Sequence, residues 1–242
     1  MAAQEGQSKG LSNFETVAYA IPAIGAGYMS LLIGLFIMKF STDVLLIAPA
    51  VMGTIFGVSR VWDAISDPLI GYWSDRTRSR LGRRRFWLLL SLLPLALTFV
   101  MVFSPPMTLT GNLLIAWMAI GVIGFYSAVT LLIVPHLSLG AEMTSDYHER
   151  SRLYGFRHAA YTVGSIIALA SMQVLINAEQ ESPEAVRTTA FHLSVVAGLV
   201  SAVLLASLWW FSAIEMTIRT DRQEHPLRRL RISGRMRTRG WS

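Results

Sequence analysis

The sequence predicts an all-α membrane protein whose chain crosses the bilayer six times. Of its 242 residues, 53% are hydrophobic, and the mean hydropathy is positive, which is too apolar for a typical soluble domain. Six segments are long enough to span a membrane, which takes roughly 20 apolar residues each. Most arginines lie in connections that six crossings would return to one side of the membrane.

The predicted spans cover residues 17–40, 44–73, 86–103, 112–139, 156–176 and 191–214. The first contains Pro22 and a set of glycines that permits close packing: Gly25, Gly27 and Gly34. A short, nearly uncharged turn at residues 41–43 follows, which we place on the outer side. The second span starts with Pro49 and carries Gly53 and Gly57, a spacing that favours helix contacts.

The third span follows a loop, residues 76–85, with six arginines within ten residues, and the positive-inside rule places this loop in the cytoplasm. An uncharged outer turn at residues 105–111 leads to the fourth span, where Tyr126 and Thr130 lie one helical turn apart. The charged segment 146–157 comes next and is expected on the same side as the arginine loop.

A net acidic outer loop, residues 177–188, is expected to join the last two spans, and the sixth ends in an aromatic belt: Trp209, Trp210 and Phe211. We therefore expect a multi-pass protein of the plasma membrane, the inner membrane in bacteria, with both termini cytoplasmic. Residues 1–13 form the predicted cytoplasmic N-terminus, without a cleavable signal peptide, and residues 14–214 form the six-helix bundle.

Residues 215–242 differ in kind from the rest, with seven arginines after Thr220 and little apolar periodicity. They are either an arginine-rich cytoplasmic tail attracted to anionic lipid or the start of a central loop whose continuation is missing. We favour the second interpretation.

Charge and composition exclude several function classes. The net charge is +6, but the arginine clusters flank apolar spans, which indicates a lipid bilayer rather than nucleic acid as the partner. The chain has no cysteine, which excludes disulfides and thiolate chemistry. No phosphate-binding loop, Ser/His/Asp set or zinc spacing appears, and the histidines are scattered. His136 follows Pro135 and could touch a cavity, but we expect it to be a packed or interfacial residue. An enzyme is not predicted.

The second span carries two carboxylates, Asp63 and Asp67, which with Ser66 project from one helix face, one turn beyond Arg60. Acids inside a membrane span are costly and usually mark ion or substrate paths. Two such carboxylates ionise together only with a cation between them, and oxygen ligands suit sodium or a proton. In the alternative reading, Arg60 neutralises the acids and they only hold the helix in place. An intramembrane aspartyl protease is disfavoured, because both acids lie on one helix.

Two segments together resemble a known family. Residues 60–85, from Arg60-Val-Trp-Asp63 through Gly82-Arg83-Arg84-Arg85, and residues 134–152, which contain Pro135-His136 and Gly140-Ala141-Glu142, are similar to the glycoside-pentoside-hexuronide:cation symporters, the melibiose-carrier branch of the major facilitator superfamily. The likeness covers about residues 14–214. It implies the N-terminal half of that fold, six helices arranged as a 3+3 inverted repeat.

The resemblance also implies functional residues. The cation site would comprise Asp63, Ser66, Asp67 and Thr130, with Asp63 and Asp67 as metal ligands if the coupling ion is sodium; Ser66 replaces the family's usual asparagine. Arg157 matches a sugar-binding arginine, whereas Gly27 stands where the melibiose branch has an acid; with Tyr126 they complete the substrate-binding set. The loop after the second span resembles the superfamily's gating loop, implying roles for Asp75, Arg76, Arg83 and Arg84, beside simple topological anchoring by charge.

The family has two six-helix halves, so a missing C-terminal half or a homo-oligomer is implied as partner. The expected function is sodium- or proton-coupled symport of a sugar or glycoside, by a truncated or half-size form and without a cofactor other than the coupling ion. The alternatives are a non-transporting fragment or assembly partner and a carrier of an amphiphilic, lysolipid-like substrate.

Overall fold

The computed structural model describes residues 10–79 and 81–207, and every regular element within these ranges is helical. The elements are α1 (Asn13–Ala20), α2 (Pro22–Lys39), the π-helical turn η1 (Phe40–Val44), α3 (Pro49–Arg76), α4 (Arg83–Phe103), α5 (Gly111–Met143), α6 (Tyr147–Glu181) and a last helix, Pro183–Ser207. The predicted all-α class is thereby confirmed. The predicted aromatic belt and the tail at residues 215–242 lie outside the described residues.

Within the part of the chain that the structure describes, five helical stretches are long and apolar enough to cross a membrane: Asn13–Val44, Arg83–Phe103, Gly111–Met143, Tyr147–Glu181 and Pro183–Ser207. The second predicted span, α3, is a helix of 28 residues, which corresponds to about 42 Å at 1.5 Å per residue. It is missing from the apolar set among the described residues, and its own sequence carries Arg60, Asp63 and Asp67. These charged residues in the middle of α3 explain why it is less apolar than the five other stretches.

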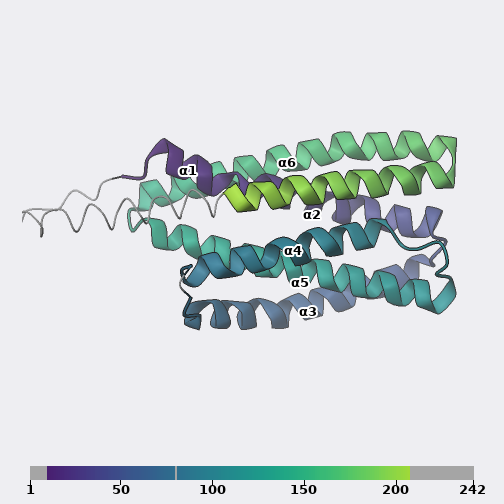
Figure 1. Ribbon diagram of the computed structural model, residues 1–242, viewed down its shortest axis with the longest axis horizontal. Coiled ribbons are helices and arrows are strands. Elements are labelled where there is room, and N and C mark those ends of the chain that lie inside the picture. Colours follow the sequence, from purple (N-terminus) through teal and green to yellow (C-terminus); the bar gives the residue numbers. More distant parts are fainter. Residues whose placement is uncertain (1–9, 80, 208–242) are drawn as a thin grey trace, which may run out of the picture.

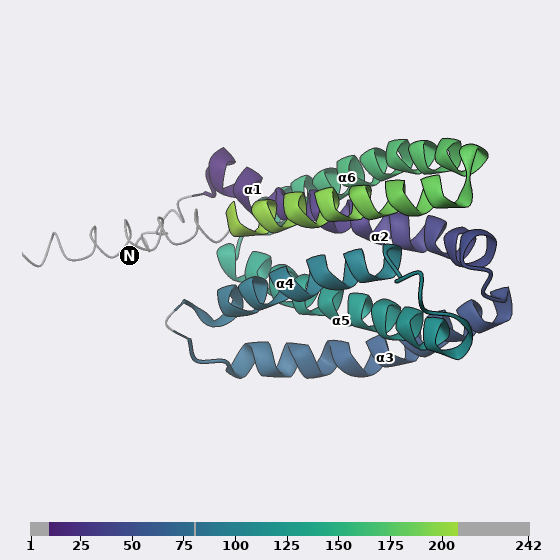
Figure 2. The ribbon, with the colours of Figure 1, turned by 45° about the vertical axis from the view of Figure 1, so that its right-hand side comes forward.

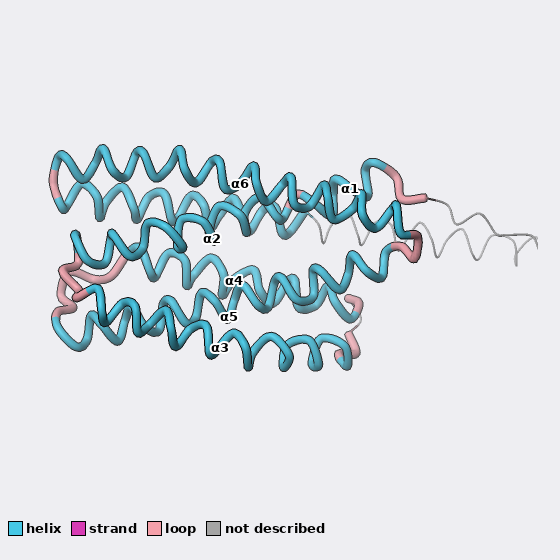
Figure 3. Tube along the Cα trace, turned by 180° about the vertical axis from the view of Figure 1, so that it is seen from behind, coloured by secondary structure: helices cyan, strands magenta, loops and turns pink. Residues whose placement is uncertain are grey.

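The helices run along the long axis of the bundle, with connections at both ends (Figures 1 and 3). The α3–α4 and α5–α6 connections lie at one end, on the left in Figure 1, and Figure 2 shows the same arrangement. The arginine loop and the charged segment 146–157 thus share one end of the molecule, as predicted. The α4–α5 connection and η1 lie at the other end.

The first predicted span is one helical path with a break. Ser12 and Glu15 form a capping box, with Glu15 N–H donating to Ser12 Oγ at 3.1 Å, so that α1 begins at Asn13. Pro22 has no N–H group to continue the hydrogen-bond ladder, and α1 ends just before Ile21. The path resumes as α2 at Pro22.

The predicted fifth span, residues 156–176, and the predicted acidic loop, residues 177–188, were wrong in their bounds. Asp146 caps α6 by accepting a hydrogen bond from Glu149 N–H at 2.8 Å, so the charged segment is already helical. At the other end only Ser182 interrupts the helices, and its Oγ accepts from Ala185 N–H at 3.0 Å, ahead of the last helix. Local capping outweighs the polar composition that indicated loops.

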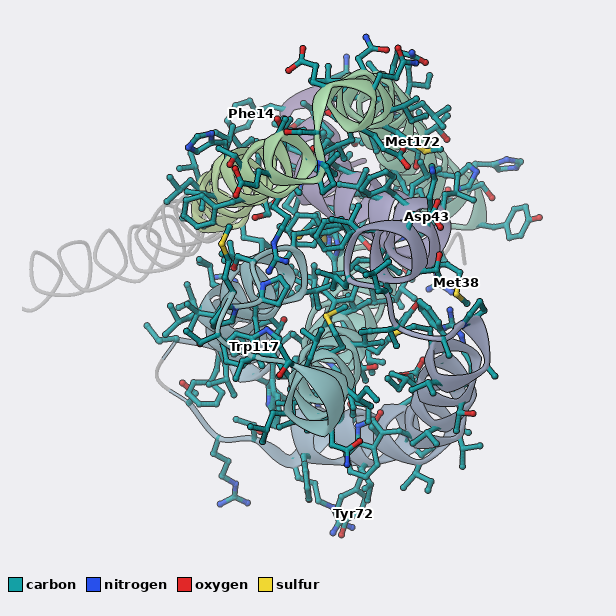
Figure 4. The ribbon with its side chains drawn as sticks, turned by 90° about the vertical axis from the view of Figure 1, so that its right-hand side faces the viewer. Phe14, Met38, Asp43, Tyr72, Trp117 and Met172 are labelled. Atoms are coloured by element: carbon teal, nitrogen blue, oxygen red, sulfur yellow. The ribbon has the colours of Figure 1, made fainter. Side chains whose placement is uncertain are left out.

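The helices form two groups. α1 and α2 pack on α6, and α3 and α4 pack on α5. Figure 4 looks along the bundle and places Phe14 of α1 and Met172 of α6 on one side and Tyr72 of α3 on the other. A buried aromatic cluster joins the groups, with the rings of Phe99 and Phe103 5.1 Å apart and Phe36 stacked on Phe103.

Glycines bring α2 and α6 into backbone contact. A Cβ on Gly27 would overlap the carbonyl of Tyr161, and one on Gly164 would overlap the carbonyl of Ile24. By contrast, a Cβ on Gly53 or Gly57 would meet no atom within 4 Å in the described part of the chain. The expected close contact at the second pair is therefore not made within this chain.

Gly164→Ala is expected to destabilise the bundle by about 1–3 kcal/mol, since overpacking forces the helices apart. Gly34→Ala is the matched control, because a Cβ there meets nothing within 4 Å. Thermal unfolding in detergent should separate the two variants. Equal melting temperatures would show that the α2–α6 backbone contact contributes little to stability.

Candidate functional site

The acid on the last turns of α3 is tied to α5. Thr130 Oγ1 donates a hydrogen bond to Asp67 Oδ1 at 2.8 Å, although the two residues lie 63 positions apart. The Thr130 side chain is buried, and the two helices lie side by side in Figures 1 and 3. The helix pairing expected for a cation site is therefore present in the fold.

One oxygen of the Asp63 carboxylate has a partner, and the other has none among the described residues. Its Oδ2 lies 3.3 Å from Arg60 Nη1, and its side chain is 20% exposed. Its Oδ1 is buried and has no hydrogen-bond partner among the described residues. A buried, unpaired carboxylate oxygen costs on the order of several kcal/mol, so a further partner such as a water molecule, a proton or a cation would stabilise it. Each interpretation of Asp63 thus has an observation in its favour. The pair with Arg60 favours a structural role, and the unpaired Oδ1 favours a cation site.

Ser66 lies between the two acids along α3 and is buried. Its hydroxyl donates, at a long 3.5 Å, to the carbonyl of Asp63 in its own helix. The hydroxyl oxygen keeps lone pairs that can accept or coordinate. The described residues hold no group of three or more His, Cys, Asp or Glu that could bind a metal ion. The oxygen-bearing side chains here are those of Asp63, Asp67, Ser66 and Thr130.

A second contact layer lies one to two turns before these residues. Arg60 Nη2 donates to the Tyr126 hydroxyl at 3.1 Å, and its guanidinium sits 4.4 Å from the centre of the Tyr126 ring. Trp62 Nε1 donates to Ser127 Oγ at 2.8 Å. Tyr126 of α5 therefore contacts Arg60, the same arginine that pairs with Asp63.

At the end of the bundle that carries the arginine loop, Arg84 links three elements. It pairs with Asp75, and its Nη1 donates to Ser74 Oγ at 2.7 Å. Its Nε donates to Glu142 of α5 at 3.1 Å. Arg83 adds a contact of 2.6 Å to the same Glu142 carboxylate. Arg84 is the buried member of this group, which we call the Arg84 cluster.

The chain matches a family described as MFS/sugar transport protein over residues 18–238. It belongs to this family.

Related proteins narrow the branch. The inner membrane symporter YicJ of Escherichia coli K12 is 32% identical over 71% of this chain and 37% of its own length. The putative glycoside/cation symporter YagG of the same organism is 30% identical over 79% and 41%, and sodium-dependent lysophosphatidylcholine symporter 1-A of Danio rerio is 26% identical over 69% and 31%. The resemblance to the glycoside-pentoside-hexuronide:cation symporters is confirmed, and these relatives are transporters, not enzymes. The chain spans about a third of their length.

The four residues predicted to act in gating, Asp75, Arg76, Arg83 and Arg84, differ in their contacts. Asp75, Arg83 and Arg84 join the Arg84 cluster, whereas Arg76 stacks on Tyr72 of its own helix, with its guanidinium 4.0 Å from the ring centre. Glu142 was not among the predicted gating residues. Its position near the end of α5, on the same side as the arginine loop, was the signal that could have identified it.

The three predicted substrate residues, Gly27, Tyr126 and Arg157, lie on three different helices, α2, α5 and α6. Gly27 is buried in the α2–α6 contact and has a packing role. Arg157 lies on α6, and its Nε is buried without a hydrogen-bond partner among the described residues. Tyr126 lies on α5 and contacts Arg60 of α3. His136 is a packed, buried residue, as expected.

Proposed function

We propose that this chain forms the cation-binding half of a symporter that couples sodium or proton entry to uptake of a sugar or glycoside. The buried Oδ1 of Asp63, beside the Asp67–Thr130 hydrogen bond, is the observation that carries the proposal. A small cation at this point would be coordinated by oxygens of Asp63 and Asp67, with Thr130 and Ser66 as neutral donors. The family name and the glycoside/cation relative support the substrate class.

The proposed architecture has six crossings, with α3 as the polar one, arranged as a 3+3 inverted repeat with both termini cytoplasmic. The shared end of the arginine loop and segment 146–157 supports this orientation, because arginine-rich connections are retained in the cytoplasm. Apolar side chains remain exposed along α3, including Val58, Val61 and Ile65. A C-terminal half or a second copy would cover this face and enclose a substrate site between two bundles.

Coupling would follow from the two carboxylates. Asp63 and Asp67 repel each other when both are ionised, and a bound cation removes that repulsion. The cation therefore favours whichever bundle arrangement holds the two acids close together, and rocking of the bundles exposes the site alternately. Protons would compete with sodium for the same oxygens. Arg60, which already contacts Asp63, would be displaced toward Tyr126 when the cation binds.

Uptake of a labelled sugar panel, with and without sodium, tests the proposal. We expect uptake that rises with the sodium or proton gradient when the chain is co-expressed with a matching C-terminal half, and none from the chain alone. Gradient-independent uptake would contradict coupling. A labelled lysolipid in the same assay tests the amphiphile alternative, for which the lysophosphatidylcholine symporter is the supporting relative. Absence of transport of every compound would leave the assembly-partner function as the better account.

A further inference from the structure

Tyr19 of α1 and His136 of α5 bind each other twice. The Tyr19 hydroxyl donates to the His136 carbonyl at 3.0 Å, and His136 Nε2 lies 2.9 Å from the Tyr19 carbonyl. A carbonyl only accepts, so Nε2 carries the proton and donates. The ring centroids are 4.5 Å apart, and the two residues are 1% and 2% exposed. We call this reciprocal pair the Tyr19–His136 clamp.

The clamp joins two points where proline weakens a helix. Pro22 follows the break between α1 and α2, and Pro135 precedes His136 inside α5. A proline inside a helix removes one backbone hydrogen bond and allows the helix to bend. The clamp therefore joins the two helices at the places where proline removes a backbone hydrogen bond from each of them.

The surroundings are shaped around the clamp. A Cβ on Gly140, one turn after His136, would overlap the Tyr19 hydroxyl. Tyr154 of α6 packs on Tyr19, with ring centroids 6.4 Å apart, and its hydroxyl donates to the Leu137 carbonyl at 2.7 Å. The α1–α2–α6 group and the α3–α4–α5 group are thus joined by polar contacts at this level, and the two Tyr19–His136 hydrogen bonds among them are buried.

α5 carries contacts on both sides of the clamp. Thr130, six residues earlier, reaches Asp67, and Glu142, six residues later, reaches Arg84. At 1.5 Å per residue, each lies about 9 Å along the helix from His136. A rotation or bend of α5 at Pro135 would move the Thr130 hydroxyl relative to Asp67, and a hydrogen bond weakens steeply when its geometry is lost.

We propose that Tyr19 and His136 are positioning residues that hold α5 where Thr130 reaches Asp67, and that they thereby set the affinity of the cation site. The inference rests on the proposed cation site and adds to it two residues that touch neither carboxylate. Their effect is transmitted through Thr130 alone.

The test is a double-mutant cycle on the purified chain in detergent, with thermal unfolding followed while sodium chloride replaces choline chloride at constant ionic strength, and with pH varied in a second series. Tyr19→Phe and His136→Leu are each expected to weaken cation binding about fivefold to tenfold, the size expected for a lost neutral hydrogen bond. His136→Gln keeps an N–H that can reach the Tyr19 carbonyl and should stay within about twofold of the original chain.

The Thr130→Val background distinguishes positioning from general loosening. If the clamp acts through Thr130, Tyr19→Phe changes affinity less than about twofold once the Thr130 hydroxyl is gone, because contacts that share one path are not additive. An equal effect in both backgrounds, or no effect of Tyr19→Phe in the original chain, overturns the inference. Unfolding of His136→Leu leaves the Tyr19→Phe cycle to decide.

The cation site itself is judged separately. Thr130→Val should weaken cation binding whatever the clamp variants do, and a normal response from Thr130→Val would refute the site while the clamp contacts remain. A chain that responds to neither sodium nor pH would overturn both proposals. A response lost in Thr130→Val but unchanged in the clamp variants would overturn the clamp alone.

Discussion

Asp63→Asn is expected to weaken cation binding by about 100-fold, because removing one partner of a buried charge pair costs roughly 3 kcal/mol. The neutral amide cannot balance a bound cation, and the buried position of Oδ1 would then hold an uncharged group. Asp67→Asn should have a similar effect, since Asp67 provides the second carboxylate. The measurement is the rise in melting temperature with sodium, which a ligand produces when it binds only the folded state.

Asp43→Asn is the matched control. Asp43 is a carboxylate of the same chemistry that pairs with Lys39 at 2.8 Å, at the end of the bundle opposite the arginine loop. It should retain the full cation response. A normal response from both Asp63→Asn and Asp67→Asn would show that the acids serve only to pair with Arg60, the alternative that the sequence left open.

The parts of the fold that the sequence could predict are those set by local pattern. Hydrophobic runs placed the helices of the first four predicted spans to within about five residues, although α3 is not among the stretches apolar enough to cross a membrane. Capping is also a local property. The polar composition around Asp146 and Ser182 predicts loops, but both residues stand directly ahead of helix-forming segments and cap them. The predicted fifth span, residues 156–176, is therefore shorter than α6 at both ends.

Contacts between helices depend on rotation and register, which one sequence does not specify. The pairing of Asp67 with Thr130 came from resemblance to a family, and the structure places the two side chains in contact. α3 and α5 start at the same end of the bundle, so their contacts advance together, from Arg60–Tyr126 to Asp67–Thr130. The hydrophobic periodicity of the sequence does not identify Tyr126 as the partner of Arg60. That pairing depends on the offset of α3 relative to α5 along the bundle axis.

Arg84→Lys is expected to loosen the end of the bundle that carries the arginine loop and to speed amide hydrogen exchange around residues 74–84 about tenfold or more. Lys keeps the positive charge but replaces the planar guanidinium, with its five N–H donors, by a compact ammonium group. The ammonium cannot reach Ser74, Asp75 and Glu142 at the same time. Each charge-assisted hydrogen bond lost is worth roughly 1.5–3 kcal/mol, enough for a tenfold change in local opening. Hydrogen–deuterium exchange with mass spectrometry is the measurement.

Arg78→Lys provides the control, because Arg78 is exposed and belongs to the same loop. Both substitutions leave the charge of the loop unchanged, so topological anchoring by positive charge predicts no difference between them. If the Arg84 cluster fastens the three helices, amide exchange becomes faster only in Arg84→Lys, and the effect extends to the end of α5 through Glu142. Identical exchange in the two variants would mean that the arginines act by charge alone, whereas a selective effect would show that the buried guanidinium fastens α3, α4 and α5 to one another.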